Sequence, residues 1–546
     1  MSLSWMAPPK SVSRLRRTRP LVAGLVGLAV SVVVAAPLAG QQIPLSEATV
    51  AEINDAFDAG TLTAERLVEM YLARIDAYDQ QGPALNTVLW LNELALERAR
   101  ELDAERRRSG PRSPLHGIPV VLKDNVDTSD MPTTAGSILL EGSIPPDDAF
   151  LVQKLRDAGA IILAKVNMSE FASGATMSSV GGWIRNPHSL DHSPSGSSGG
   201  TGSAIAATLA QLGIGTDTGG SVRGPSTANG IAGLKPTLGL VSRDGIIPLA
   251  LSFDTGGPMA RSVHDVAAML NVIAGVDPAD EATSAAQGRI EDDYTTFLDP
   301  DALNGARIGV ARQFMGGDPE VDWVIDAGLG HIEAAGATLV DVTFDEWLVN
   351  AKSDWYTTIR WPEFRQQIPA YLETTAPEYP KTLADLIERS QEILASTDDG
   401  GRPNPVRWAL FEEEDASGEV TDFEYVTMRD HGLQLVRDHV MGVMERHDLD
   451  AIVYPTAGTR PDRVGQDVAP WDAPPSATNF ANLTGFPDLI VPAGFTTDGL
   501  PVGISFFGPA FSEPVLFGLG FAFEQRTRAR RDPVTTPPLP GEGVRR

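Results

Sequence analysis

Short apolar runs recur along most of this chain, separated by stretches with helical spacing. Residues 118–122, 160–163 and 212–215 form such runs, and others follow at 308–310, 451–454, 489–491 and 502–506. Runs without a regular polar face are typical of strands buried on both sides, because helices then cover both faces of the sheet. The pattern predicts an α/β fold in which short strands alternate with helices.

Helical spacing predicts helices before these strands and a helical insertion between them. In residues 44–109, Thr49 and Glu52 match a capping box, and apolar residues follow at helical spacing. Residues 346–444 are mostly helical and more polar, so we expect an insertion that roofs the sheet edge and shapes a pocket. The Pro- and Gly-rich residues 533–546 predict a flexible tail.

The N-terminus has the pattern of a secretory signal peptide. An uncharged apolar run at 21–38 is followed by Ala39 and Gly40, and basic residues precede it, namely Lys10, Arg14, Arg16, Arg17 and Arg19. We therefore expect residues 1–40 to be a signal peptide of a secreted or periplasmic protein, with no membrane span after processing. The alternative is an uncleaved segment that anchors the protein to a membrane.

Charge and residue types narrow the classes of partner and chemistry. The chain has 43 Lys and Arg against 72 Asp and Glu, a formal net charge of -29, so nucleic acid is not an expected partner. The absence of Cys excludes disulfides and thiolate nucleophiles. The eight His show no strong metal-binding spacing, so we expect no metal site.

Two neighbouring Gly- and Ser-rich segments are the strongest candidates for chemistry. They cover residues 192–202 and 213–223, and the second begins within an apolar run that predicts a buried strand. The Thr-Asp-Thr-Gly-Gly-Ser turn at 216–221 would present a hydroxyl beside glycine N–H groups at the end of that strand. An oxyanion hole needs this arrangement.

A nucleophilic serine needs a base, and two lysines fit the requirement. Lys123 and Lys165 each follow an apolar run, so both side chains are expected to be buried. Burial lowers the pKa of a lysine and lets the neutral amine accept a proton. These residues alone leave the choice between the two open.

Several ordered motifs resemble the amidase signature family, most closely its bacterial peptide amidases. They lie at residues 114–125, 186–187, 196–200, 215–221, 233–242, 254–261, 499–503 and 523–528. The resemblance extends over about residues 45–532. It implies one α/β/α domain at 41–532, with a large mixed β-sheet covered by helices on both faces.

The resemblance also assigns roles to particular residues. It implies that Ser221 is the nucleophile, that Ser197 is a bridging serine after a cis peptide bond, and that Lys123, not Lys165, is the base. Backbone N–H groups would form the oxyanion hole, and neighbouring side chains would support the loops. The expected oxyanion-hole residues are Thr218, Gly219, Gly220 and Ser221, and the expected supporting residues are Ser198, Asp217 and Arg223.

The implied activity is hydrolysis of a linear amide to an acid and ammonia or an amine, through an acyl-enzyme and without a cofactor. C–N bonds other than peptide bonds would be cleaved, in a small-molecule or peptide amide. The turn at 218–224 is closer to the general family pattern than to the peptide amidases, so C-terminal peptide amides, aryl or aliphatic amides and esters all stay open. Phe171 and Trp183 are candidates for an apolar pocket wall or for the core. No oligomeric state is predicted.

Three other interpretations fit parts of the sequence. Residues 196–200 match the G-x-S-x-G elbow of α/β-hydrolase esterases with Ser198 as nucleophile, but no apolar strand precedes them. The amidotransferases of tRNA-dependent amidation have an A-type subunit that shares the motifs, but a signal-like N-terminus is not expected there. A non-catalytic protein on this fold would lack Lys123, Ser197 or Ser221, and all three are present.

Overall fold

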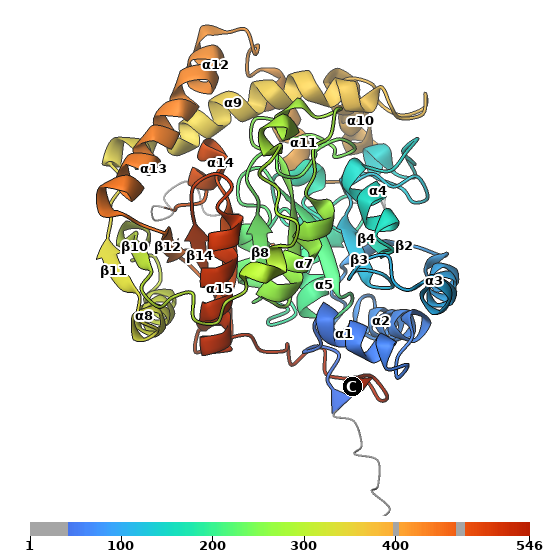
Figure 1. The fold of residues 1–546 in the computed structure, drawn as a ribbon. Coiled ribbons are helices and arrows are strands. Elements are labelled where there is room, and N and C mark those ends of the chain that lie inside the picture. Colours follow the sequence, from blue (N-terminus) through green and yellow to red (C-terminus); the bar gives the residue numbers. More distant parts are fainter. Residues whose placement is uncertain (1–41, 397–402, 466–475, 546) are drawn as a thin grey trace, which may run out of the picture. The chain divides into compact units, whose positions relative to one another are not determined.

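The computed structural model describes residues 42–396, 403–465 and 476–545 (Figure 1). Residues from Gln41 to Arg546 form one compact unit. The predicted signal peptide at 1–40 lies outside the described residues. Within the described ranges, no helix combines the length and the apolar character that crossing a membrane requires.

A mixed sheet of eleven strands forms the centre of the fold, in the order β11-β10-β12-β14-β13-β8-β9-β7-β3-β4-β2. β3 is parallel to both β4 and β7, and β10 is parallel to β11 and β12, whereas the other neighbours are antiparallel. The strands are β2 (Val88–Leu91), β3 (Pro119–Lys123), β4 (Ile161–Val166), β7 (Leu212–Asp217), β8 (Ala232–Lys235), β9 (Thr255–Ala260), β10 (Arg307–Val310), β11 (Thr338–Asp341), β12 (Ala451–Pro455), β13 (Asp488–Phe495) and β14 (Pro501–Phe507).

All seven apolar runs form strands of this sheet, and four further strands were not predicted from sequence. β8 and β9 have the sequences AGLK and TGGPMA, and their Gly and Pro residues weaken the strand signal. β2 interrupts the stretch expected to be helical throughout, and β11 lies at the opposite edge of the sheet. The capping box at Thr49 is present as predicted.

Glycines in the central strands let helices pack closely on both faces of the sheet. Cβ atoms at Gly213 and Gly215 of β7 would come within 2.5 Å of Thr201 and 2.8 Å of Ser198, so α5 lies against this face. Gly256 of β9 points to the other face, where a Cβ would meet Leu151 of α4 at 3.2 Å. The helices outside the insertion are α1 (Val50–Asp58), α2 (Ala64–Tyr78), α3 (Ala95–Ser109), α4 (Phe150–Asp157), α5 (Gly199–Ala206), α6 (Arg223–Ala228), α7 (Val263–Ile273), α8 (Pro319–Ala334), α14 (Phe480–Thr484) and α15 (Glu513–Thr527).

The described part of the expected insertion forms a group of helices within residues 346–395 and 405–447, and α9 runs across the top of the view in Figure 1. The apolar residues of these helices pack in two clusters, one with β12 and β14 and one with residues 135–140 and 247–249. The members are α9 (Glu346–Leu372), α10 (Leu383–Ala395), α11 (Pro405–Asp415), α12 (Phe423–Thr427) and α13 (Leu433–His447), with a π-helical turn at Met428–Gly432.

The C-terminal residues are packed against the domain, which differs from the expected flexible tail. β15 (Val544–Arg545) pairs with β1 (Gln42–Ile43), and Val544 is fully buried. Arg74 of α2 holds Glu542 in an ion pair of 2.8 Å whose two side chains are almost fully buried. Proline-rich composition predicted flexibility, whereas these long-range contacts hold the segment.

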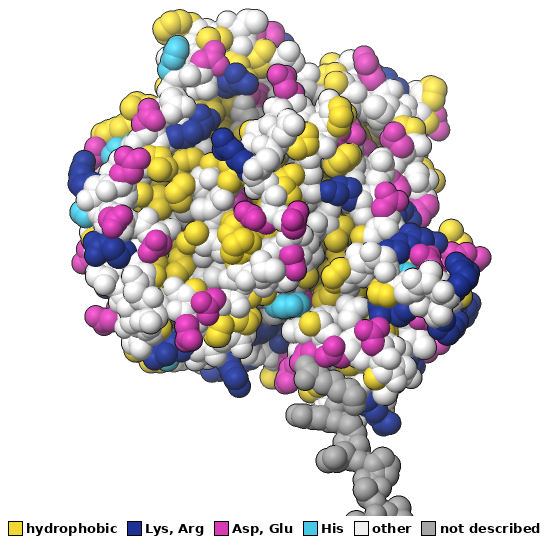
Figure 2. All heavy atoms as spheres, viewed as in Figure 1, with side chains coloured by type: hydrophobic (Ala, Val, Ile, Leu, Met, Phe, Trp, Pro, Cys, Tyr) yellow, Lys and Arg dark blue, Asp and Glu magenta, His cyan; other side chains and the backbone are white. Residues whose placement is uncertain are grey.

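The surface carries mixed charge. On the face shown in Figure 2, Asp and Glu side chains are scattered, and many of the Lys and Arg side chains lie over α3 at the right. Because the only buried residues of α3 are Ala95, Ala99 and Leu102, its charged side chains lie at the surface.

Candidate active site

The candidate residues converge because β3 and β7 are parallel neighbours. Lys123 is the last residue of β3 and Asp217 the last of β7, so both strands end at the same edge of the sheet. The turn that follows β7 carries Ser221, and the segment leading into α5 carries Ser197. Residues from distant parts of the sequence therefore meet at one strand-end edge, where ligand sites of α/β sheets commonly lie.

Lys123 is fully buried and hydrogen-bonded to the candidate bridging serine. Its Nζ lies 2.7 Å from Ser197 Oγ, 2.7 Å from Thr216 Oγ1 and 3.3 Å from the Thr216 carbonyl oxygen. Burial lowers the pKa of Lys123 to about 7, against the smaller opposing effects of Asp217 and Asp254. A substantial neutral fraction near pH 7 makes this amine suited to accept a proton.

Lys165, the other candidate base, has different neighbours. Its Nζ donates to Thr133 Oγ1 at 2.6 Å and lies 3.5 Å from a carboxylate oxygen of Asp124 in a fully buried pair. Burial also lowers the pKa of Lys165, but the two acidic neighbours Asp124 and Asp127 oppose that shift. The geometry thus places Lys123, and not Lys165, beside Ser197.

Ser197 and Ser198 have different surroundings. The peptide bond between Gly196 and Ser197 is cis, as the family resemblance implies. Ser198 is fully buried, its hydroxyl donates to the Thr216 carbonyl at 3.2 Å, and its N–H donates to the Ser221 carbonyl at 3.2 Å. Ser198 therefore ties the two candidate turns together, which fits a supporting residue better than an exposed nucleophile.

Asp217 and Arg223 brace the turn around Ser221. Arg223 Nε and Nη2 donate to the two oxygens of Asp217 at 3.1 Å and 3.2 Å, and Arg223 also pairs with Asp488. Burial alone would raise the pKa of Asp217, but the Arg223 guanidinium and the Asn482 amide hold it well below its usual range. Burial likewise opposes the charge of Arg223, and its carboxylate partners keep its pKa above the usual range.

Residues 218–221, here called the oxyanion turn, differ in one respect from the sequence expectation. The N–H of Gly220 donates to Asp217 Oδ1 at 2.8 Å, so in this conformation it is engaged inside the turn. Within the described ranges, the N–H groups of Gly219 and Ser221 have no protein acceptor. The Thr218 hydroxyl donates to Asp254 at 2.5 Å. The Gly220 N–H, which the motif assigned to the oxyanion hole, is therefore bound by the Asp217 carboxylate.

Of the two proposed pocket residues, Phe171 belongs to the core. It is 2% exposed, and its ring packs edge-on against Phe364 and Phe411. Of the two alternatives for Phe171, pocket wall or core, the structure supports the core, because the aromatic side chains of α9 and α11 enclose it. Trp183 of β6 (Gly182–Trp183), which pairs with β5 (Met177–Ser178), is 38% exposed and lines a cavity.

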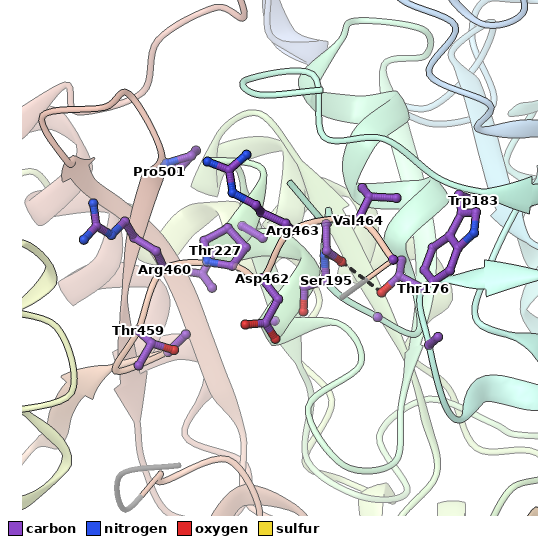
Figure 3. Close-up of a pocket in the computed structure, with 18 of the residues that line it drawn as sticks. Thr176, Trp183, Ser195, Thr227, Thr459, Arg460, Asp462, Arg463, Val464 and Pro501 are labelled. Atoms are coloured by element: carbon purple, nitrogen blue, oxygen red, sulfur yellow. Dashed lines mark hydrogen bonds between the residues drawn. The ribbon is translucent and has the colours of Figure 1, made fainter. Parts of the chain in front are cut away.

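That cavity has a volume of about 320 Å³ and adjoins the segment that leads to Ser197. Figure 3 shows Thr176, Ser195 and Trp183 on one side and Arg460 on the other. Gly196, which precedes Ser197, is one of its lining residues. No cluster of three or more potential metal ligands occurs in the part of the chain that the structure describes.

Several residues that contact the site were not among the predicted site residues. Thr216 hydrogen-bonds Lys123, and Asn125 Nδ2 donates to Thr216 Oγ1 at 3.1 Å. Both lie in the amidase-like motifs, so a hydroxyl and an amide near the predicted lysine were the available signal. Tyr356 of α9 and Thr478 pack against Gly219 and Gly220. No local pattern marks these two, because only long-range packing brings them to the turn.

The family model described as Amidase matches residues 66–517. A curated Arabidopsis thaliana protein described as "Probable amidase" is 33% identical over 504 residues, covering 90% of this chain and 92% of that protein. The A-type subunit of the glutamyl-tRNA(Gln) amidotransferase of Acinetobacter baumannii is 36% identical over 492 residues, covering 88% and 96%.

Solved structures of peptide amidases are also similar to this chain. The native peptide amidase from Stenotrophomonas maltophilia has a TM-score of 0.82 at 41% identity, covering 90% of this chain and 100% of that chain. Peptide amidase PAM in complex with the competitive inhibitor chymostatin has a TM-score of 0.81 at 42% identity, covering 89% and 99%. These similarities extend over the strands and turns that carry the candidate residues.

Proposed function

This chain belongs to the amidase family and is a hydrolase acting on C–N bonds, and from that premise we propose that Ser221, Ser197 and Lys123 are its catalytic triad. One observation carries the proposal. Lys123 Nζ lies 2.7 Å from Ser197 Oγ in surroundings that lower the lysine pKa to about 7. A neutral amine in contact with a hydroxyl is the arrangement that general-base activation of a serine requires. The N–H of the next residue, Ser198, donates to the Ser221 carbonyl and so joins this segment to the turn of the nucleophile.

Proton transfer follows from this arrangement. Neutral Lys123 takes the proton of Ser197 while Ser197 takes the proton of Ser221, and Ser221 Oγ attacks the amide carbonyl carbon. The N–H groups of Gly219 and Ser221 would stabilise the negative oxygen of the tetrahedral intermediate. Lys123 then returns its proton through Ser197 to the leaving nitrogen as the C–N bond breaks. Water attacks the acyl-enzyme by the same relay and releases the acid.

For the substrate, we favour a C-terminally amidated peptide. The similarity to peptide amidases supports this choice. Aryl amides, aliphatic amides and esters are the alternatives on the same triad. The cavity of about 320 Å³ that Gly196 lines has the size of small-ligand pockets and accommodates any of these amides, and its lining includes none of the three triad residues.

The decisive experiment measures ammonia release from an amidated dipeptide, an aliphatic amide and an aryl amide. Ser221→Ala should lower kcat/KM by about 10³-fold or more, because it removes the nucleophile. Ser198→Ala is the matched control, and it should retain far more activity since Ser198 only joins the turns. Activity that survives Ser221→Ala and disappears in Ser198→Ala would contradict the triad and favour the esterase-type elbow.

A second candidate function is that of the A-type subunit of an amidotransferase, favoured by the 36% identity to that protein. In that role the chain would release ammonia from glutamine and would require partner proteins for the transfer. Gel filtration with candidate partners, together with a glutaminase assay, separates the two functions. Hydrolysis of amidated dipeptides by the isolated chain, without glutaminase activity, would support the amidase.

We also propose that residues 1–40 direct export and are removed. The basic residues and the apolar run support this proposal. Cell fractionation followed by N-terminal sequencing should find the protein outside the cytoplasm, beginning near Gln41. A cytoplasmic protein that retains its first residues would contradict it, and a membrane fraction with an intact N-terminus would indicate an anchor.

A further inference from the structure

Tyr356, on the insertion helix α9, reaches the turn that carries the candidate nucleophile. A Cβ placed on Gly219 would lie 2.6 Å from Tyr356 Oη and 2.9 Å from its Cζ, so the phenol end packs directly over this glycine. Gly219 belongs to the oxyanion turn, and its N–H has no protein acceptor in the described ranges. The hydroxyl of Tyr356 therefore borders the position where the substrate carbonyl must bind.

Neighbouring residues fix the direction of this ring. Tyr356 stacks on Phe253, with ring centroids 5.2 Å apart and an interplanar angle of 26°. The next residue, Asp254, accepts the hydroxyl of Thr218, and its other oxygen accepts the N–H groups of Leu249 and Ala250. The ring thus rests on a segment that is itself hydrogen-bonded to the oxyanion turn, so it is held in place before substrate binds.

The Tyr356 hydroxyl has no hydrogen-bond partner among the described residues, and the side chain is only partly buried. Burial raises the pKa of this phenol above its usual value, so it stays protonated at neutral pH. Other tyrosines of the insertion use their hydroxyls within the protein: Tyr371 donates to Asp127, Tyr379 to the Glu141 carbonyl and Tyr425 to Glu363. Tyr356 is different in keeping a donor directed at the candidate site.

We propose that Tyr356 is a specificity-determining residue whose hydroxyl donates a hydrogen bond to a carbonyl oxygen in the acyl part of the substrate. An amidated peptide supplies such an acceptor in the peptide bond that precedes its terminal amide. A saturated aliphatic amide has no second acceptor. The hydroxyl therefore favours peptide-like amides, and this inference rests on the amidase function proposed above.

The test compares kcat/KM for an amidated dipeptide with kcat/KM for a saturated aliphatic amide of similar length. Tyr356→Phe keeps the ring and its stacking on Phe253 and removes only the hydroxyl. It should lower kcat/KM for the dipeptide amide by about tenfold, the effect of one lost hydrogen bond, and leave the aliphatic amide within about twofold. Tyr379→Phe, which removes a hydroxyl elsewhere in the insertion, should change neither.

The outcomes separate this inference from the function on which it rests. If Ser221→Ala abolishes hydrolysis but Tyr356→Phe leaves the ratio of the two kcat/KM values unchanged, the amidase function stands and the role of Tyr356 is refuted. An equal loss on both substrates also refutes it, because the hydroxyl would then serve the turn and not substrate selection. Amide hydrolysis that does not depend on Ser221 would overturn the proposed function and this inference together.

Discussion

The two N–H bonds and the lone pair of a neutral Lys123 match its three oxygen neighbours. A neutral lysine has two N–H bonds and one lone pair. Thr216 offers two acceptors, its hydroxyl and its carbonyl oxygen, at 2.7 Å and 3.3 Å from Nζ. When both N–H bonds point to Thr216, the lone pair is directed at Ser197, 2.7 Å away. Thr216 therefore orients the base as well as contacting it.

The first prediction concerns pH. The pKa of Lys123 is lowered to about 7, and only the neutral amine accepts a proton, so kcat/KM should level off above that pH. Below it, kcat/KM should fall about tenfold per pH unit as the lysine becomes protonated. A stopped assay on one amide between pH 5 and 9 measures this limb. A profile without a limb between pH 6 and 8 would contradict the assignment of Lys123 as base.

A second residue-scale prediction concerns Asp217. Asp217→Asn keeps the shape of the side chain but removes the charge that faces buried Arg223. The buried Arg223 guanidinium would then lose one of its two anionic partners, which should lower the free energy of unfolding by about 3–5 kcal/mol. Thermal or urea unfolding measures the loss, and Ser221→Ala, which touches no charge, should be near wild type. Equal stability of the two variants would show that Asp488 alone suffices for Arg223.

At the scale of elements, a buried cluster of charged residues joins α9 to α11. Glu414 forms ion pairs with Arg360 of α9 at 2.6 Å and with Arg407 of its own helix at 2.9 Å, and all three side chains are buried. The Arg407 guanidinium also lies 4.2 Å from the Phe411 ring centroid. Since Tyr356 lies one helical turn before Arg360, this cluster fixes the part of α9 that borders the oxyanion turn.

Glu414→Gln should loosen this connection. Two buried guanidinium groups would lose their common anion, at a cost of about 3–5 kcal/mol. Hydrogen exchange should quicken in α9 and α11 while the central strands stay protected. Asp415→Asn is the matched control, because the neighbouring Asp415 is half exposed and pairs with Arg365 at the surface. If exchange in α11 is the same in both variants, the cluster does not hold the insertion in place.

Elements with a local side-chain pattern could be predicted from the sequence, and those that depend on long-range packing could not. Apolar runs identified strands such as β3 and β7, because burial on both faces leaves a local pattern, and the motifs placed Lys123 beside Ser197. β9 was missed because TGGPMA lacks a side-chain pattern, although those same glycines let the neighbouring elements approach. Tyr356 was missed because its proposed role depends on its packing against Gly219, a contact between residues far apart in the chain.

At the scale of the whole molecule, the two halves of the chain pack against each other in two places, at the candidate site and around the C-terminal segment. The lysine and serines come from β3, β7 and the segment before α5, whereas α9 and Thr478 pack over the oxyanion turn. At the far end of the domain, α2 of the N-terminal part holds the C-terminal segment. Tyr78 donates to the Pro537 carbonyl at 2.6 Å, and Arg74 pairs with Glu542.

This last pair yields a prediction for kinetic stability. Arg74 is 1% exposed, so Glu542→Gln should leave a buried guanidinium without its anion and release the C-terminal segment. The half-life of activity at an inactivating temperature should fall several-fold. Glu69→Gln is the control, because the pair of Glu69 with Arg66 is exposed and worth little. An unchanged half-life for Glu542→Gln would show that the segment does not limit unfolding.

Pairing of β1 with β15 brings Ile43 opposite Val544, so two points near the ends of the described chain lie side by side. A short peptide linker across this pair would cyclise the backbone without bending either strand. Closing a ring of roughly 500 residues would remove about 6 kcal/mol of chain entropy from the unfolded state. The same proximity makes the domain a candidate for circular permutation, with new ends opened in a surface loop far from Ser221.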